Sequence, residues 1–343
     1  MTLLTTHNPA LPLPPNTAAE LMRMFIDQDT DALLVGACLA LLAQRDPSAE
    51  ELHAFASALL EVALPFPAAP MRVLDTCGTG GDGAGTPNLS TLAAMLLAHL
   101  GVPVVKHGNR AATSICGSAD LLEGLGHDIA RNPAQLHADL ARSRFAFLFA
   151  PAYHPLLGRL REIRRRLGIP TIFNVLGPLL NPARPQLQVL GVSRESLLRP
   201  MAGALALQGV QRAFVVHGKC AEGRGMDEAS TEGPTQVVEV RDGRVRPMQV
   251  LVPRDLGITP PRRGALQIHA RDEAITVARA LAEGATAPGF RSAVADAVAL
   301  QAGLGLLLHR DQGLEALPVA IAECGGALCD GFPLPLVAAE ASA

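Results

Sequence analysis

Apolar residues recur at helical spacing in the first part of the chain. Three segments between residues 17 and 63 place leucine, alanine, methionine or phenylalanine every three or four positions, which predicts three helices. Ser48-Ala-Glu-Glu51 has the order of a capping box and marks the start of the third helix. Prolines at positions 65, 67 and 70 then break the pattern, as in a linker. We therefore expect a small helical domain at residues 1–68 and a second domain at residues 69–343.

After the prolines, short runs rich in β-branched residues alternate with longer helical stretches. The runs predicted as strands are 72–76, 102–105, 145–149, 171–174, 187–192, 213–217 and 236–240. The stretches predicted as helices are 92–100, 271–283 and 290–309. Prolines and charges interrupt 248–258, which fits neither pattern. This alternation is typical of an α/β fold with a mostly parallel sheet flanked by helices.

The link between the first strand and the first helix of this second domain is rich in glycine. Gly78, Gly80, Gly81, Gly83 and Gly85 remove the side chains that would keep a bulky anion away. They also allow several backbone N–H groups to turn toward one point. The simpler alternative is a tight connection that binds nothing. The number of glycines, directly after a strand, favours a loop that cradles phosphate.

Polar residues follow the glycines where the helix is expected to begin. Asn88, Ser90 and Thr91 would add side-chain donors to the unpaired N–H groups of the first helical turn. No Gly-Lys-Ser/Thr follows the glycines, so the loop is not a Walker loop. Asp82 lies inside the loop and would repel a phosphate unless a cation lay between them. A bound metal ion is therefore expected here.

A basic segment follows the second predicted strand. Lys106 and Arg110 flank Gly108, and hydroxyl side chains follow as far as Ser118. Point charges and hydroxyl donors in this order suit phosphate oxygens. A solvated basic turn is the alternative, and it becomes the weaker one beside a glycine loop.

Two adjacent carboxylates, Asp227 and Glu228, occur in a glycine-bounded stretch after the predicted strand 213–217. On a loop, unlike on a helix or strand, neighbouring side chains can face one centre. Oxygen ligands beside a phosphate select Mg²⁺, which keeps few protein carboxylates and several phosphate or water oxygens. Without a phosphate site nearby, the pair would be ordinary solvated surface.

The last candidate region joins a histidine to a run of arginines. His154, between a tyrosine and a proline, is a candidate substrate contact, and the alternative is a packed loop histidine. Arg164, within the arginine-rich stretch 159–166, could pair bidentately with a carboxylate. Its alternative is a place on a solvated helix face.

Composition and charge narrow the class of protein. The chain has 343 residues, is 49% hydrophobic and carries a net charge of -3, so it can form a sizeable core and lacks the basic footprint of a nucleic-acid binder. Aromatic residues make up only 3%, which is poor material for base stacking. The six cysteines show no paired spacing, and we find neither a signal sequence nor a membrane span. We expect a cytoplasmic protein without a membrane or nucleic-acid partner.

The four segments together resemble the anthranilate phosphoribosyltransferases, which belong to the nucleoside phosphorylase-like class of phosphoribosyltransferases. The matching stretches are 78–83 with 88–91, 106–110 with 117–118, 174–182, and 227–228 leading into 233–235. The resemblance implies transfer of the 5-phosphoribosyl group from phosphoribosyl pyrophosphate to the amine of anthranilate, in tryptophan biosynthesis. It also implies a homodimer, with part of residues 151–182 joining the small helical domain across the cleft from the α/β domain.

The resemblance further implies the role of each matching residue. Phosphoribosyl pyrophosphate is expected at Gly78, Gly81, Asp82, Thr86, Asn88, Leu89, Ser90, Thr91, Lys106, His107, Gly108, Asn109, Arg110, Ala111, Ala112, Thr113, Ser114 and Ser118. Two Mg²⁺ ions are expected on the pyrophosphate, held by Ser90, Asp227 and Glu228. Anthranilate is expected at Asn109, Arg164 and the backbone around Gly78, with Arg164 matched to its carboxylate. Lys106 and Arg164 are the expected catalytic residues.

Three positions depart from the family pattern. Pro87 stands where the family has phenylalanine. Ala274 takes the place of asparagine in the family's Glu-Asn-Ala element, and Gln301 takes the place of asparagine in its Leu-Asn-Ala element. These departures leave two alternatives open: a diverged paralogue acting on another aromatic amine, and a nucleic-acid-binding relative without activity. The glycine loop and the acidic pair argue against the latter. Phosphorolysis of pyrimidine nucleosides on a related fold is weaker still, because its glycine loop has another residue order.

Overall fold

The computed structural model describes residues 8–67, 71–111, 114–284 and 290–338. Three helices open the described chain: α2 (Pro15–Ile26), α3 (Ala32–Leu42) and α4 (Ala49–Glu61). The capping box predicted at the start of α4 is confirmed. The Glu51 amide donates to Ser48 Oγ at 3.2 Å, and the Ser48 amide donates to Glu51 Oε2 at 2.9 Å. Two orphan amides at the helix start are thereby satisfied.

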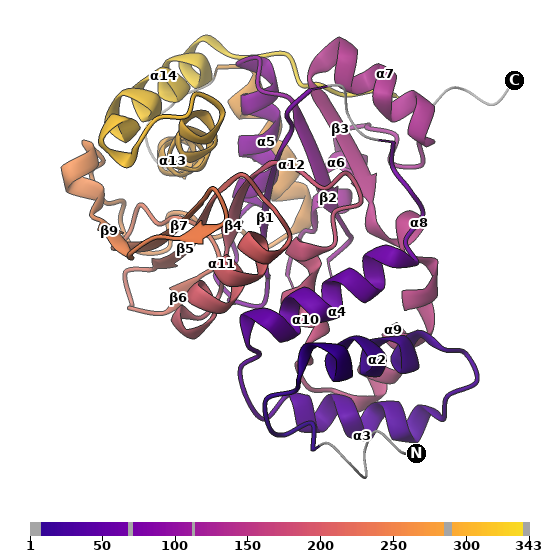
Figure 1. The fold of residues 1–343 in the computed structure, drawn as a ribbon. Helices are drawn as coiled ribbons and strands as arrows, with labels where there is room; N and C mark the ends of the chain where they lie inside the picture. The colour runs from indigo at the N-terminus through magenta and orange to yellow at the C-terminus, as the bar shows by residue number, and fades with distance from the viewer. Residues whose placement is uncertain (1–7, 68–70, 112–113, 285–289, 339–343) are drawn as a thin grey trace, which may run out of the picture.

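Two later helices, α9 (Gly158–Leu167) and α10 (Phe173–Leu176), share the apolar core of the first three. Their buried side chains belong to the same apolar cluster as those of α2 to α4, and the ribbon shows α9 and α10 beside these helices (Figure 1). The prediction of a strand at 171–174 is wrong. The Thr171 amide donates to Asn174 Oδ1 at 2.9 Å, and the Asn174 amide donates to the Thr171 carbonyl. This tight turn leads directly into α10, so two β-branched residues at 171 and 172 gave a misleading pattern.

The second part of the described chain is built on one sheet, as the alternation of strands and helices predicted. Five parallel strands lie in the order β3 (Phe145–Phe149), β2 (Val104–Gly108), β1 (Leu74–Gly78), β4 (Leu187–Gly191) and β5 (Arg212–Lys219). Antiparallel strands continue it: β7 (Thr235–Arg241), β6 (Gly225–Met226), β8 (Arg244–Val245) and β9 (Gln249–Leu251). The segment 248–258, which fitted no pattern, contains β9 and the 3-10 turn η4 (Pro253–Leu256).

Helices cover both faces of the sheet (Figure 1). One face packs against α5 (Leu89–His99), α12 (Arg271–Ala282), α13 (Phe290–His309) and α14 (Leu317–Asp330). The other packs against α4, α11 (Leu198–Leu207) and α7 (Pro133–Ser143). The remaining short elements are α6 (Ser118–Gly124), α8 (Ala150–Tyr153), η1 (Pro155–Leu157), η2 (Gly177–Leu179), η3 (Glu195–Leu197) and η5 (Leu314–Ala316). The predicted α/β fold with a smaller helical part is confirmed.

The topology fixes where loops can meet. Strands β1, β2 and β4 are parallel neighbours and end at Gly78, Gly108 and Gly191. Their carboxyl ends therefore lie at one edge of the sheet, where open α/β sheets bind ligands. Among the described residues, no helix has both the length and the apolar character that crossing a membrane requires.

Candidate functional site

The glycine loop connects β1 to α5, as predicted. Gly80, Gly81, Gly83 and Gly85 all have φ between 66° and 78°, a region that costs other residues energy. The loop's path depends on these four glycines. Asn88 also has a left-handed φ of 58° and stands immediately before the helix, so α5 begins where the polar residues predicted it.

Missing side chains let the acidic pair approach the sheet edge. A Cβ added to Gly78 would lie 2.0 Å from Asp227 Oδ2, and one added to Gly191 would lie 1.6 Å from the Asp227 carbonyl oxygen. Neither contact is sterically possible. Residue 227 therefore packs directly against the backbone of the glycines that end β1 and β4.

Both carboxylates of the pair turn toward the glycine loop. Asp227 Oδ2 accepts a hydrogen bond from the Gly80 amide at 2.6 Å, and Glu228 Oε1 accepts one from the Ser90 amide at 3.0 Å. The Asp227 amide in turn donates to Asp82 Oδ2 at 3.3 Å. Residues 78–91 and 227–228, far apart in the chain, therefore form one site. The two carboxylates accept hydrogen bonds from backbone amides of the kind that would bind phosphate oxygens.

The electrostatics of this site favour a cation. Burial, followed by repulsion from Asp82, raises the pKa of Asp227 to about 8. Burial, followed by repulsion from Asp227, raises the pKa of Glu228 well above its ordinary value. Glu228 Oε2 is buried and has no hydrogen-bond partner among the described residues. A divalent ion would relieve the repulsion and give this oxygen a partner, so the donor set fits Mg²⁺.

The carboxylates alone do not complete a metal site. Within the part of the chain that the structure describes, no group of three or more His, Cys, Asp or Glu side chains is placed to hold a metal ion. Asp227 and Glu228 would therefore share an ion with oxygens from elsewhere. The hydroxyl of Ser90 is close by, because the Ser90 amide already contacts Glu228.

The Lys106 ammonium group is buried against Thr76 and Ser90 and is not exposed at this site. Lys106 is 2% exposed, and its Nζ donates to the Thr76 carbonyl and, at 3.3 Å, to Ser90 Oγ. Burial lowers its pKa, opposed first by the charge of Asp75. The Thr76 hydroxyl donates to the Ser90 carbonyl at 2.8 Å. Lys106 thus links the start of α5 to strand β1.

The basic segment after β2 is held by Ser118. A Cβ added to Gly108 would lie 2.1 Å from Ser118 Oγ, which accepts from the Asn109 amide and donates to the Asn109 carbonyl, both at 3.2 Å. Asn88 Nδ2 donates to the Cys116 carbonyl at 3.3 Å and so ties this segment to the glycine loop. The segment and the loop form one side of the site.

Several residues predicted at the site have side chains that point away from it or lie outside the described residues. Arg110 pairs with Glu123 at 2.6 Å, and its guanidinium lies 4.8 Å from the centre of the Phe149 ring. Ala111 and Ser114 are exposed. Ala112 and Thr113 lie outside the described residues. Leu89 is fully buried in the core, so only its backbone could meet a ligand.

His154 is packed beside His107. The two ring centres are 5.3 Å apart, His154 is 6% exposed, and its Nε2 lies 2.9 Å from the Leu180 carbonyl oxygen. Burial lowers the pKa of both rings, that of His107 to about 3. Both imidazoles are therefore neutral, and His154 can support His107 without itself facing a ligand.

Arg164 lies in α9, apart from the glycine loop. Its Nη2 donates to Asn174 Oδ1 at 3.2 Å, and its guanidinium lies 5.5 Å from the centre of the Phe173 ring. Burial lowers its pKa. These contacts with α10 hold the guanidinium in place, and they leave part of its donor set for a carboxylate.

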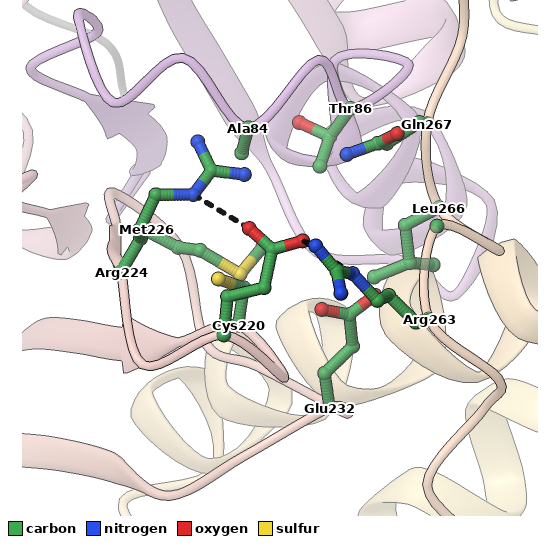
Figure 2. A pocket seen from close by; sticks show the side chains of 11 residues that line it. Ala84, Thr86, Cys220, Arg224, Met226, Glu232, Arg263, Leu266 and Gln267 are labelled. Atoms are coloured by element: carbon green, nitrogen blue, oxygen red, sulfur yellow. Dashed lines mark hydrogen bonds and ion pairs between the residues drawn. The ribbon is translucent and has the colours of Figure 1, made fainter.

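Sequence reasoning missed a contact on the outer side of the glycine loop (Figure 2). Arg224 Nη1 donates to the Gly83 carbonyl at 3.4 Å, and its Nε donates to Glu222 at 3.0 Å. Arg263 also donates to Glu222, at 2.6 Å, across a narrow cleft that Ala84 and Thr86 line from the loop. Thr86 thus faces this outer cleft. A Gly-Arg pair three residues before the acidic pair was the only available signal, and it is weak.

Asp75 is a second residue that sequence reasoning left without a role. It is 1% exposed on β1, and its Oδ2 accepts from Asn181 Nδ2 at 2.9 Å. Its other carboxylate oxygen has no partner among the described residues. Burial raises its pKa to about 6, and the charge of Lys106 opposes this rise. A buried acid therefore lies within the strand that ends at Gly78.

Of the three departures from the family pattern, two lie in the core. Ala274 is fully buried in α12, and Gln301 is 4% exposed in α13. Both helices cover the face of the sheet that packs against α5. Pro87 is buried within the glycine loop and is the one departure that lies at the site.

Residues 71–325 match the family described as "Glycosyl transferase family, a/b domain". The anthranilate phosphoribosyltransferase of Parasynechococcus marenigrum (strain WH8102) is 44% identical over 320 residues, covering 92% of this chain and 87% of that protein. The enzyme of the same name from Oleidesulfovibrio alaskensis is 47% identical over 250 residues, covering 73% and 71%.

Solved structures are similar over nearly the whole chain. Anthranilate phosphoribosyltransferase from Thermus thermophilus superposes with a TM-score of 0.86 at 37% identity, covering 96% of this chain and 95% of that one. The enzyme from Saccharomyces cerevisiae, in complex with PRPP and Mg, superposes with a TM-score of 0.79 at 26% identity, covering 92% and 89%.

The buried acid on β1 gives a pH dependence of stability. An acid whose pKa is higher in the folded than in the unfolded protein lowers the free energy of unfolding as the pH rises between the two values. For Asp75 this window runs from 3.8 to about 6, and a difference of this size corresponds to about 3 kcal/mol. We expect Asp75→Asn to remove this loss, so the variant gains stability over the wild type from pH 4 to pH 7.

Urea unfolding of both proteins across this pH range measures the difference. Asp255→Asn, which changes an exposed aspartate, is the control and should follow the wild type. Parallel curves for wild type and Asp75→Asn would show that Asp75 is not a buried acid of raised pKa.

Proposed function

The chain belongs to the anthranilate phosphoribosyltransferase family, and from this premise we propose which of its residues bind the substrates and the metal. The enzyme transfers the 5-phosphoribosyl group of phosphoribosyl pyrophosphate to the amine of anthranilate and releases pyrophosphate, in tryptophan biosynthesis. The relatives support this reaction rather than a nucleic-acid-binding role or another amine. The observation that carries the assignment of residues is the contact of Asp227 and Glu228 with the glycine loop.

The donor substrate is proposed to lie along the glycine loop and the segment after β2. Amides of residues 78–91 and the first turn of α5 supply donors for the pyrophosphate and the 5-phosphate. Ser90 and Thr91 add hydroxyls, and Asn109 with its neighbours closes the other side. The Gly80 and Ser90 amides, which donate to Asp227 and Glu228, lie among these donors.

We assign two Mg²⁺ ions to Asp227, Glu228 and the hydroxyl of Ser90. Bound Mg²⁺ would neutralise the negative charge that develops on the departing pyrophosphate. Glu228 Oε2, which has no partner in the described part of the chain, and the repulsion that Asp227 exerts on Glu228 support this placement. Lys106 adds its charge from beneath Ser90, to which it donates at 3.3 Å.

The remaining residues mainly position the anthranilate amine for in-line attack on ribose C1. Breaking the bond from ribose C1 to pyrophosphate leaves positive character on the sugar, and the amine attacks its opposite face. We assign the anthranilate carboxylate to Arg164 and the nearby contacts to Asn109 and the Gly78 backbone. Positioning of this kind can supply about 7 to 11 kcal/mol. The amine becomes acidic only as it bonds, so no strong general base is required.

The quaternary structure is proposed to be a homodimer formed through α3. Leu33, Ala37 and Leu41 recur every four residues and are exposed, Leu33 to 81%. An apolar stripe on one helix face of a small domain is typical of a protein interface. We propose residues 1–68, with part of 151–182, as the small domain that faces 69–343 across the cleft. We place the enzyme in the cytoplasm, as expected from the sequence.

Loss of the acidic pair tests the metal site. Asp227→Ala with Glu228→Ala should reduce Mg²⁺-dependent turnover at least about 100-fold, because charge stabilisation of the leaving group is lost. The other adjacent Asp-Glu pair of the chain, Asp272 and Glu273 in α12, provides the matched control, and its double alanine variant should keep near-normal activity. Equal activity of the two double variants would remove residues 227 and 228 from the site.

Arg164 is tested by comparing the two substrates. Arg164→Ala should raise the KM for anthranilate about 10- to 100-fold, the cost of a charged hydrogen bond, and change the KM for the donor little. Arg165→Ala is the control, because that arginine is exposed and pairs with Glu162. Steady-state kinetics with each substrate varied in turn gives the comparison. A similar rise in both KM values would contradict the assignment to anthranilate.

The dimer is tested by charging α3. The wild type should sediment at about twice the 35.8 kDa of one chain, and Leu33→Glu with Leu41→Glu should sediment as a monomer. Val319→Glu changes another highly exposed apolar residue, in α14, and should leave the dimer intact. A charged α3 variant that still sediments as a dimer would place the interface elsewhere.

A further inference from the structure

A second groove lies at the opposite edge of the sheet from the glycine loop. It has a volume of about 400 Å³, within the range of small-molecule sites. It is enclosed by the last turns of α4 and α11, the segment 178–186 and the amino end of β4. None of the residues assigned above to the substrates or the metal lines it.

The floor of the groove is preformed. Asn181 and Gln188 line it, and each is at most 3% exposed. Asn181 Nδ2 donates to Asp75 Oδ2 at 2.9 Å and to the Val105 carbonyl at 2.8 Å. Gln188 Nε2 donates to the Pro178 carbonyl at 2.7 Å. These side chains are held by the sheet, so a ligand would not have to order them.

The groove has one cation that is free to bind. Arg184 is the only arginine or lysine among the described lining residues, it is exposed, and it forms no ion pair within the described chain. The single acidic lining residue, Glu61, pairs with Arg23 at 3.0 Å. Arg184 is therefore the charged lining residue without an ionic partner in the described part of the chain.

One further observation indicates a binding site rather than a packing defect. Arg184 has a φ of 46°, a left-handed conformation in which a residue other than glycine is strained.

We propose that this groove binds a small organic carboxylate with an apolar body. Arg184 takes the carboxylate in a bidentate pair, and Leu60, Leu207 and Val210 contact the apolar part. The proposal does not depend on the reaction assigned to the glycine-loop site.

The test uses 4-bromophenylacetate with the full-length protein, by calorimetry and by anomalous diffraction from soaked crystals. We expect a bromine peak in the groove and saturable binding. Arg184→Ala should weaken binding at least about tenfold, whereas Arg199→Ala, which changes an exposed arginine of α11 outside the groove, should not.

Arg184→Gly separates lost binding from lost folding. Glycine adopts the left-handed conformation without strain, so this variant should be at least as stable as the wild type and still bind the probe weakly. Equal affinity in the wild type and both Arg184 variants, absence of binding, or bromine only beside residues 78–91 would overturn the proposal. Inorganic phosphate bound at Arg184 in place of the probe would overturn the ligand class.

Discussion

The close approach of residue 227 to the ends of two strands is the constraint on which the site depends. Any side chain at Gly78 or Gly191 would occupy the space of Asp227. With both positions bare, the Asp227 and Glu228 carboxylates reach the Gly80 and Ser90 amides of the glycine loop. One contact thus joins the glycine loop to the acidic pair, although about 140 residues of chain separate them.

This contact also makes the site favourable for a cation. Burial raises the pKa of both carboxylates, together with repulsion from Asp82 at Asp227 and from Asp227 at Glu228, and Glu228 keeps one oxygen without a partner among the described residues. The positive charge of Lys106 compensates the two carboxylates only in part, because Lys106 is buried against Thr76 and Ser90. A divalent ion held there would balance these charges. Under the proposed assignment, the metal and the donor substrate would meet at the same few atoms.

The sequence predicted what depends on neighbours in the chain. Glycine density, the residues at the start of α5 and the capping box of α4 are local signals, and the structure confirms the elements they predicted. The strand predicted at 171–174 failed because hydrogen bonds within a turn outweighed the β-branched pattern. Contacts between distant segments left no local trace: the fit of Gly191 against residue 227 and the burial of Lys106 follow from strand order.

The central claim is that one pocket holds the pyrophosphate between the glycine-loop amides and a metal-bearing acidic pair. Anomalous diffraction from crystals soaked with Mn²⁺ and phosphoribosyl pyrophosphate tests it, because manganese replaces magnesium and can be located directly. The account predicts manganese coordinated by Glu228 and by oxygens of a pyrophosphate that contacts residues 78–91. Manganese bound away from residues 227 and 228, or a pyrophosphate without contact to the glycine loop, would contradict it.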